Sequence, residues 1–166
     1  MLSRSAERVY WAGRYLERAE NTARIVQQYS QMLLDLPDEV GVDWPELLPV
    51  FGVPARTVAN GQPLTELQFM HLILADKDGP ASLFYSLRMA RENIRNNRDL
   101  LPMESWESIN ELYQLVRESL DSASTSEDRF EFLANCIAHC QQVFGCLHGT
   151  MSHHSPYHFL TLGQHI

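Results

Sequence analysis

Charged side chains that could bind an anion or form ion pairs are concentrated in two segments of the sequence. The first segment contains Arg14, Glu17 and Arg18. The second carries arginines at intervals of three and four residues with two further polar residues among them, and comprises Arg88, Arg91, Glu92, Asn93, Arg95 and Arg98. Guanidinium groups make two-point contacts with carboxylates and phosphates, so both segments contain candidate binding residues.

Three interpretations of these charges stay open on the sequence alone. In the first, Glu17, Glu20 and Glu92 neutralise the arginines across a helix interface, as a partly buried ion-pair network that fixes the register of the helices. In the second, the arginines bind a phosphate, a nucleotide or an acidic peptide. In the third, the charges form a solvated helix face. We favour the first and expect Glu17 to pair with Arg91 and Arg95 of another helix.

Histidines and cysteines gather late in the chain, but without the spacing of a metal site. All histidines except His71 lie between His139 and His165, close to the cysteines Cys136, Cys140 and Cys146. Zinc sites use paired short spacings such as Cys-x2-Cys, which this region lacks. We therefore expect reduced thiols in the core, no metal and no cofactor.

The sequence offers no obvious catalytic group, and we expect a protein that is not an enzyme. Neighbouring helix positions point about 100° apart, which separates His139 from Cys140. The chain has no glycine-rich phosphate loop, no H-E-x-x-H motif and no G-x-S-x-G motif.

Composition limits the possible partners and the compartment. A formal net charge of −8 disfavours a general nucleic-acid binder, because such proteins need an excess of Lys and Arg. No segment approaches the roughly 18 apolar residues that cross a bilayer, and the first residues lack the apolar core of a signal peptide. We expect a cytoplasmic protein without a membrane segment.

Apolar residues recur at intervals of three and four along most of the chain, which predicts long helices. The first helix is expected over residues 3–34, with an apolar seam that begins Val9, Ala12, Leu16, Ala19, Ala23 and Val26. Residues 36–63 form a loop rich in proline and glycine, with a short helical turn at WPELLPVF, and residues 64–75 form a buried helix.

Further seams predict the remaining helices and their ends. They run from Leu83 to Leu101, from Trp106 to Leu120 and from Phe130 to Leu147. The expected end signals are Asp78 with Pro80, Pro102, Thr125 with Asp128, and Ser155 with Pro156. The fold class is therefore all-α, an antiparallel bundle of about five to six helices.

The end of the chain resembles its beginning. Residues 159–166, FLTLGQHI, align with residues 9–16, VYWAGRYL, and pair Gly13 with Gly163. We interpret residues 1–154 as one helical unit and residues 155–166 as the start of a second, truncated repeat. Without its packing partner this segment would expose Phe159, Leu160 and Leu162 and favour a homo-oligomer.

Two long segments resemble the Alpha-E family, a bacterial all-helical domain named for a Glu-Arg motif. MLSRSAERVYWAGRYLERAENTARI is similar to its opening segment, and SLRMARENIRNNRDLLPMESWESIN is similar to its second characteristic segment. The resemblance implies an accessory module that acts with a circularly permuted ATP-grasp ligase, often with a transglutaminase-like protein nearby. ATP-dependent formation of amide or peptide bonds is the setting this implies, with the present chain as a scaffold or substrate-presenting subunit.

Overall fold

The computed structural model describes residues 3–37, 44–54, 64–120 and 126–166, and every regular element among them is helical. The elements are α1 Ser3–Asp35, the 3-10 helix η1 Trp44–Phe51, α2 Glu66–Met70, the π-helical turn η3 His71–Ala75, α3 Leu83–Arg95, α4 Met103–Ser119, α5 Ser126–Thr150 and α6 Ser155–His165. The all-α prediction is confirmed. The predicted first helix, the helical turn at WPELLPVF and the helix over 64–75 are all present.

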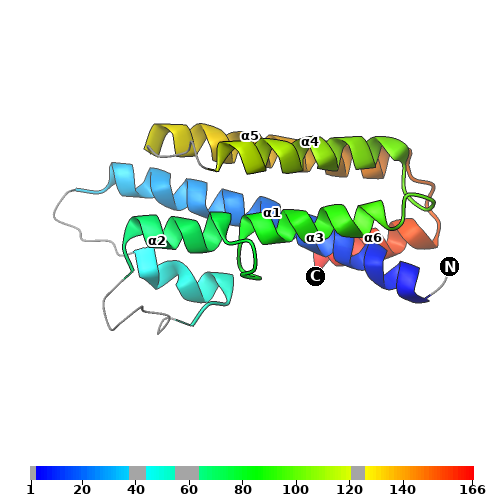
Figure 1. Cartoon of the computed structure of the whole chain (residues 1–166), viewed down its shortest axis with the longest axis horizontal. Coiled ribbons are helices and arrows are strands. Elements are labelled where there is room, and N and C mark those ends of the chain that lie inside the picture. The colour runs from blue at the N-terminus through cyan, green and yellow to red at the C-terminus, as the bar shows by residue number, and fades with distance from the viewer. Residues whose placement is uncertain (1–2, 38–43, 55–63, 121–125) are drawn as a thin grey trace.

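Four long helices form an antiparallel bundle (Figure 1). Helix α1 packs against α3 and α5, and α4 closes the ring by packing against both α3 and α5. Successive helices α1, α3, α4 and α5 run in alternating directions, and the short connections from α3 to α4 and from α4 to α5 favour this arrangement. Across the described residues, no helix is both long enough and apolar enough to cross a membrane.

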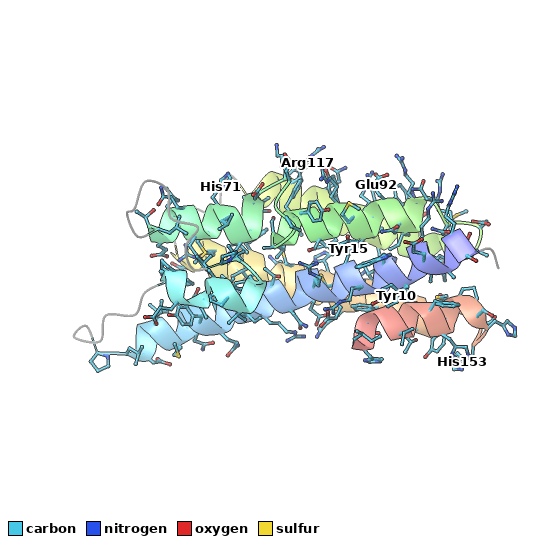
Figure 2. The ribbon with its side chains drawn as sticks, turned by 90° about the horizontal axis from the view of Figure 1, so that it is seen from below. Tyr10, Tyr15, His71, Glu92, Arg117 and His153 are labelled. Carbon is cyan, nitrogen blue, oxygen red and sulfur yellow. The ribbon has the colours of Figure 1, made fainter. Side chains whose placement is uncertain are left out.

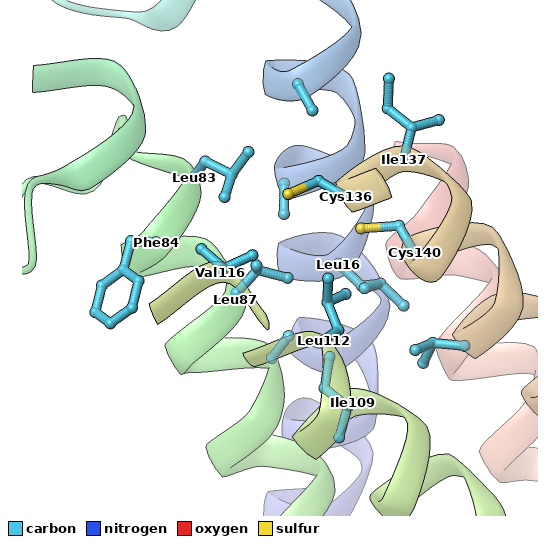
Figure 3. Packing of buried hydrophobic residues seen from close by; sticks show 14 of the residues in the cluster. Leu16, Leu83, Phe84, Leu87, Ile109, Leu112, Val116, Cys136, Ile137 and Cys140 are labelled. Carbon is cyan, nitrogen blue, oxygen red and sulfur yellow. The ribbon is translucent and has the colours of Figure 1, made fainter. Parts of the chain in front are cut away.

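The core is built from the predicted seams. Val9, Ala12, Leu16, Ala19, Ala23 and Val26 of α1 are all buried. Figure 3 shows side chains of the other three helices pointing toward this seam, including Leu83 and Leu87, Leu112, and the sulfurs of Cys136 and Cys140. Each fully buried leucine contributes roughly 1.5–3 kcal/mol through removal of apolar surface from water.

Several helix ends differ from the prediction. Helix α3 begins after Ser82, whose hydroxyl accepts the backbone N–H of Tyr85, rather than at Asp78 and Pro80. It ends at Arg95, and the buried Asn97 then donates to the carbonyl of Asn93.

Differences also occur at the starts of other helices. The cap residue of α6 is His154, so Ser155 is the first helical residue and not the cap. Helix α2 begins with a capping box between Thr65 and Gln68. The expected cap at Thr125 lies outside the described residues.

Helix α6 lies along the outside of α1 and runs in the same direction (Figures 1 and 2). A methyl group added to Gly13 would collide with the carbonyl oxygen of Leu160, and one added to Gly163 would collide with the carbonyl oxygen of Tyr10. Leu160 stands 150 positions after Tyr10, as Gly163 does after Gly13, so the two close approaches are reciprocal. The two glycines allow backbone-to-backbone contact at the crossing.

Two copies of one helix related by a local two-fold axis would make such reciprocal contacts. The assignment of a second repeat stays a prediction. The expected exposure of α6 is wrong for Leu160, which is buried against α1. Phe159 and Leu162 remain 38% and 48% exposed. These two residues align with Val9 and Ala12, which are buried in α1. Self-association through this face stays a prediction as well.

The glycine crossing can be tested by adding one methyl group at a time. Gly13→Ala and Gly163→Ala should each lower the free energy of unfolding by about 1–3 kcal/mol, because the new Cβ meets backbone that cannot rotate away. Gly145→Ala and Gly149→Ala are matched controls in α5, where the added Cβ meets open space. These should raise stability by up to about 1 kcal/mol through helix propensity. Urea unfolding of all four variants measures the difference, and a stabilised Gly13→Ala variant would contradict the tight crossing.

Candidate functional site

Glu17, the acidic residue of the first charged segment, contacts side chains of its own helix, α1. Arg14 Nη1 donates to Glu17 Oε2 at 2.6 Å, and the amide of Asn21 donates to Glu17 Oε1. The expected pairing of Glu17 with Arg91 and Arg95 is wrong. Partners one helical turn away are already within reach of the carboxylate, so a contact across the bundle is not required to neutralise it.

Arg18 connects α1 to the segment that precedes α3. Its Nη2 donates to the backbone carbonyl of Pro80 at 2.7 Å. The next glutamate of α1, Glu20, is paired within the helix, since a carboxylate oxygen of Glu20 lies 2.6 Å from Arg24 Nη2. Arg18 does reach across an interface as expected, but its partner there is a carbonyl oxygen and not an acid.

The arginine of the second segment that is best enclosed lies between two aromatic rings. The guanidinium carbon of Arg91 is 5.0 Å from the ring centroid of Trp106 and 4.8 Å from that of Tyr113. Its Nε donates to Asn110 Oδ1 at 2.9 Å, and Nη1 lies 3.4 Å from a carboxylate oxygen of Glu92. Arg91 thus joins α3 to α4 by its contacts with the two rings and its hydrogen bond to Asn110, while Glu92 of its own helix balances its charge.

The other members of the second segment make looser contacts. Arg88 lies 3.8 Å from the exposed Asp78, and Arg95 lies 3.1 Å from Glu92. The guanidinium carbon of Arg98 is 5.4 Å from the ring centroid of Trp106, and the amide of Asn93 donates to the carbonyl of Met89 in its own helix. Sequence reasoning missed the role of the aromatic residues, although Trp106 and Tyr113 stand seven positions apart, two helical turns along one face.

The first segment lines a cavity of about 430 Å³ on the surface of α1. Helix α1 contributes the polar lining, η1 and Ala81 contribute much of the apolar lining, and Ile166 completes it. The lining residues are Arg14, Glu17, Arg18, Asn21, Thr22, Ile25, Val50, Phe51, Gly52, Ala81 and Ile166. Figure 2 shows the middle of α1 between η1 and the end of α6, which is where this cavity lies. The arginines from Arg88 to Arg98 are not part of its lining, so the structure separates the two predicted groups.

Burial controls the electrostatics of the cavity. It raises the pKa of the Glu17 carboxyl above its ordinary value, and the nearby Arg14 guanidinium opposes this shift without cancelling it. Burial also raises the pKa of the Tyr15 hydroxyl, with a further contribution from Tyr85.

Two of the three thiols of α5 are buried and poor nucleophiles. Cys136 and Cys140 are buried, and burial raises the pKa of both well above the ordinary range, so the reactive thiolate is scarce. Among the described residues, no group of three or more histidine, cysteine, aspartate or glutamate side chains is placed to hold a metal ion.

Comparison with known proteins identifies the family. The sequence model of the Alpha-E family, described as a predicted alpha-helical domain with a conserved ER motif, matches residues 1–166. The chain belongs to the Alpha-E family. Searches among curated proteins and among solved structures gave no match.

The Alpha-E description directs attention to Glu-Arg pairs. This chain contains two of them, Glu7-Arg8 and Glu17-Arg18. Both members of the second pair line the α1 cavity, and Arg18 also holds the backbone at Pro80. The cavity around Glu17 and Arg18 is therefore the candidate functional site of this Alpha-E chain.

The stacked arginine should tolerate replacement far less than an exposed neighbour. Arg91→Lys keeps the positive charge but loses the planar group that stacks between the rings and donates to Asn110, so it should cost about 1–3 kcal/mol of unfolding free energy. Arg95→Lys is the matched control, because Arg95 is half exposed and its pair with Glu92 is worth less than about 1 kcal/mol. Thermal or urea unfolding compares the two. Equal losses would mean that stacking contributes little.

The pH dependence of stability should report the desolvated Glu17 carboxylate. A raised pKa in the fold means that the native state holds the proton more tightly than the unfolded chain. This contribution to stability is complete below the ordinary glutamate pKa and is lost as the pH rises through the raised value. Relative to Glu17→Gln, the unchanged protein should therefore lose stability as the pH rises above the ordinary glutamate pKa of about 4.3 and through the raised value.

The same variant tests the local pairing. At neutral pH, Glu17→Gln should leave the free energy of unfolding unchanged or raise it by less than about 1 kcal/mol, because the desolvation of the carboxylate outweighs its partly exposed contact with Arg14. Urea unfolding at several pH values provides both readings. A loss of about 3–5 kcal/mol at neutral pH would instead indicate a buried pair that bridges helices.

Proposed function

We propose that this Alpha-E chain is a non-catalytic helical module that acts with an ATP-grasp ligase in ATP-dependent formation of amide or peptide bonds. The ligase is the partner that the family resemblance implies, and a transglutaminase-like protein is a further candidate partner. This role would place the chain in the cytoplasm, where ATP is available. In this arrangement the ligase performs the chemistry, and the helical module organises the complex or presents the substrate.

The proposal of a non-catalytic role is supported mainly by the contacts that the arginines make within the chain. Arg14, Arg24, Arg91 and Arg95 each lie within 3.4 Å of a glutamate carboxylate oxygen. Arg18 is held by a backbone carbonyl. Arginines whose N–H groups already bond to other parts of the chain favour a structural role. A catalytic role requires groups that are directed at a substrate.

The surface that follows α3 offers exposed arginine side chains to a partner, beside the exposed acids Asp99 and Glu104. Arg95 and Arg98 are exposed there, and Arg98 stacks on the half-buried ring of Trp106. Arginine and tryptophan are enriched at the energetically important centres of protein interfaces. We therefore propose that the ligase contacts this end of the α3–α4 pair.

A second candidate function is the binding of a small ligand, and the cavity around Glu17 and Arg18 favours it. The two functions are compatible, because a module that presents a substrate must also hold it. The arginines from Arg88 to Arg98 do not converge on this cavity, so a ligand there would contact only the first charged segment.

Co-expression with an ATP-grasp ligase from the same organism tests the proposed function. The two proteins should elute together, and amide-bond formation by the ligase should increase when this chain is present. The chain alone should form no product from ATP and substrate. A double change, Arg95→Glu with Arg98→Glu, should separate the proteins, whereas Arg117→Glu at the far end of α4 should not.

Two results would contradict the proposal. One is a ligase that elutes separately and works equally well alone. The other is product formed by this chain without the ligase.

A further inference from the structure

The α1 cavity is an open surface depression that combines charged and apolar lining. Arg14, Glu17 and Arg18 bring two positive charges and one negative charge from consecutive turns of α1. Ile25 of α1 adds apolar surface, and three other parts of the chain add more through Val50 and Phe51 of η1, Ala81 and Ile166. A ligand that fits has a charged end and an apolar side chain.

Both arginines are held in position before any ligand arrives. Arg14 uses Nη1 for its contact with Glu17, and Arg18 uses Nη2 for its contact with Pro80. A guanidinium carries five N–H donors, so donors of both groups remain for the cavity that they line. Side chains fixed by such supporting contacts bind an anion with less loss of rotational freedom.

The charges in the cavity match a carboxylate better than a phosphate. The three charged side chains sum to a single positive charge, which one carboxylate neutralises. Phosphate carries close to two negative charges at neutral pH, and the second would be repelled by the Glu17 carboxylate in the same cavity. The Glu17 carboxylate instead suits a positively charged ammonium group.

We propose that this cavity binds an apolar amino acid or the carboxyl-terminal residue of a short peptide, with its carboxylate on Arg14 and Arg18 and its side chain against Val50 and Phe51. The proposal rests on the proposed function, since amino acids and peptides are the compounds that an amide-forming ligase joins. Val50 is 61% exposed, so contact with a ligand would bury apolar surface that is now in water.

Binding can be measured by calorimetry with a small set of probes. L-leucine and glycyl-L-leucine represent the free amino acid and the peptide terminus, and glycyl-L-leucinamide lacks the carboxylate. At least one of the first two should bind at up to about 10 mM, a range that detects millimolar dissociation constants. The amide should bind at least about tenfold more weakly, because it loses charge-assisted hydrogen bonds. Inorganic phosphate should not compete.

Two variants assign the binding to this cavity. Arg14→Gln should weaken binding of the carboxylate probe at least about tenfold, with Arg24→Gln as a control that removes an arginine of the same helix outside the cavity. Val50→Asp places a negative charge at an exposed position of the lining, where it should repel the carboxylate without unfolding the protein. The far-ultraviolet circular dichroism of each variant checks its fold.

The outcomes separate this inference from the proposed function. No binding of either carboxylate probe, equal binding of the amide, tighter binding of phosphate, or unchanged binding by both folded variants would each overturn the carboxylate site. Carboxylate binding without any complex with the ligase would retain the site and overturn the proposed partnership. A complex with the ligase that binds neither carboxylate probe would retain the proposed partnership and overturn the carboxylate site.

Discussion

The structure depends on how closely other helices can approach α1. Helix α1 contacts α3 and α5 on its bundle side and α6 on its outer side. It meets them with small residues, since Ala12, Ala19 and Ala23 are buried in the seam and Gly13 lies against the backbone of α6. Small side chains permit short distances between helix axes, and tight packing then fixes where each neighbour lies along α1.

This close packing explains why Arg14, Glu17 and Arg18 of α1 are half buried. With neighbours on several sides, only a narrow strip is left for Arg14, Glu17, Arg18 and Asn21, and the segment at Pro80 and Ala81 borders it. Removing the Glu17 carboxylate from water costs more than its contact with Arg14 returns, as the raised pKa shows. The pair between Glu17 and Arg14 lies within α1 and therefore does not hold α1 in register against its neighbours. Packing of small residues and the bond from Arg18 to a backbone carbonyl do so.

The sequence allowed most of the fold to be predicted, because apolar periodicity reports directly which side of a helix is buried. Leu16, Ile94 and Leu133 all lie in predicted seams and are fully buried. The partners of the charges could not be predicted in the same way. A long flexible side chain such as Arg18 or Arg91 can reach carbonyls, rings and acids on any neighbouring element. Its choice depends on tertiary distances that periodicity does not contain, which is why the predicted pair between Glu17 and Arg91 was wrong.

The candidate cavity follows from the same packing constraint that governs the bundle. Its polar lining could be predicted, since Arg14, Glu17 and Arg18 stand at helical spacing. Its other walls come from η1 and from Ile166, and neither has a sequence signal that links it to α1. Because α6 runs parallel to α1 and crosses it at Gly13 and Gly163, the final residue of the described chain comes to lie beside Arg14 and Glu17. A larger residue at either glycine would push the helices apart and withdraw this wall, so the crossing that stabilises α6 also shapes the cavity.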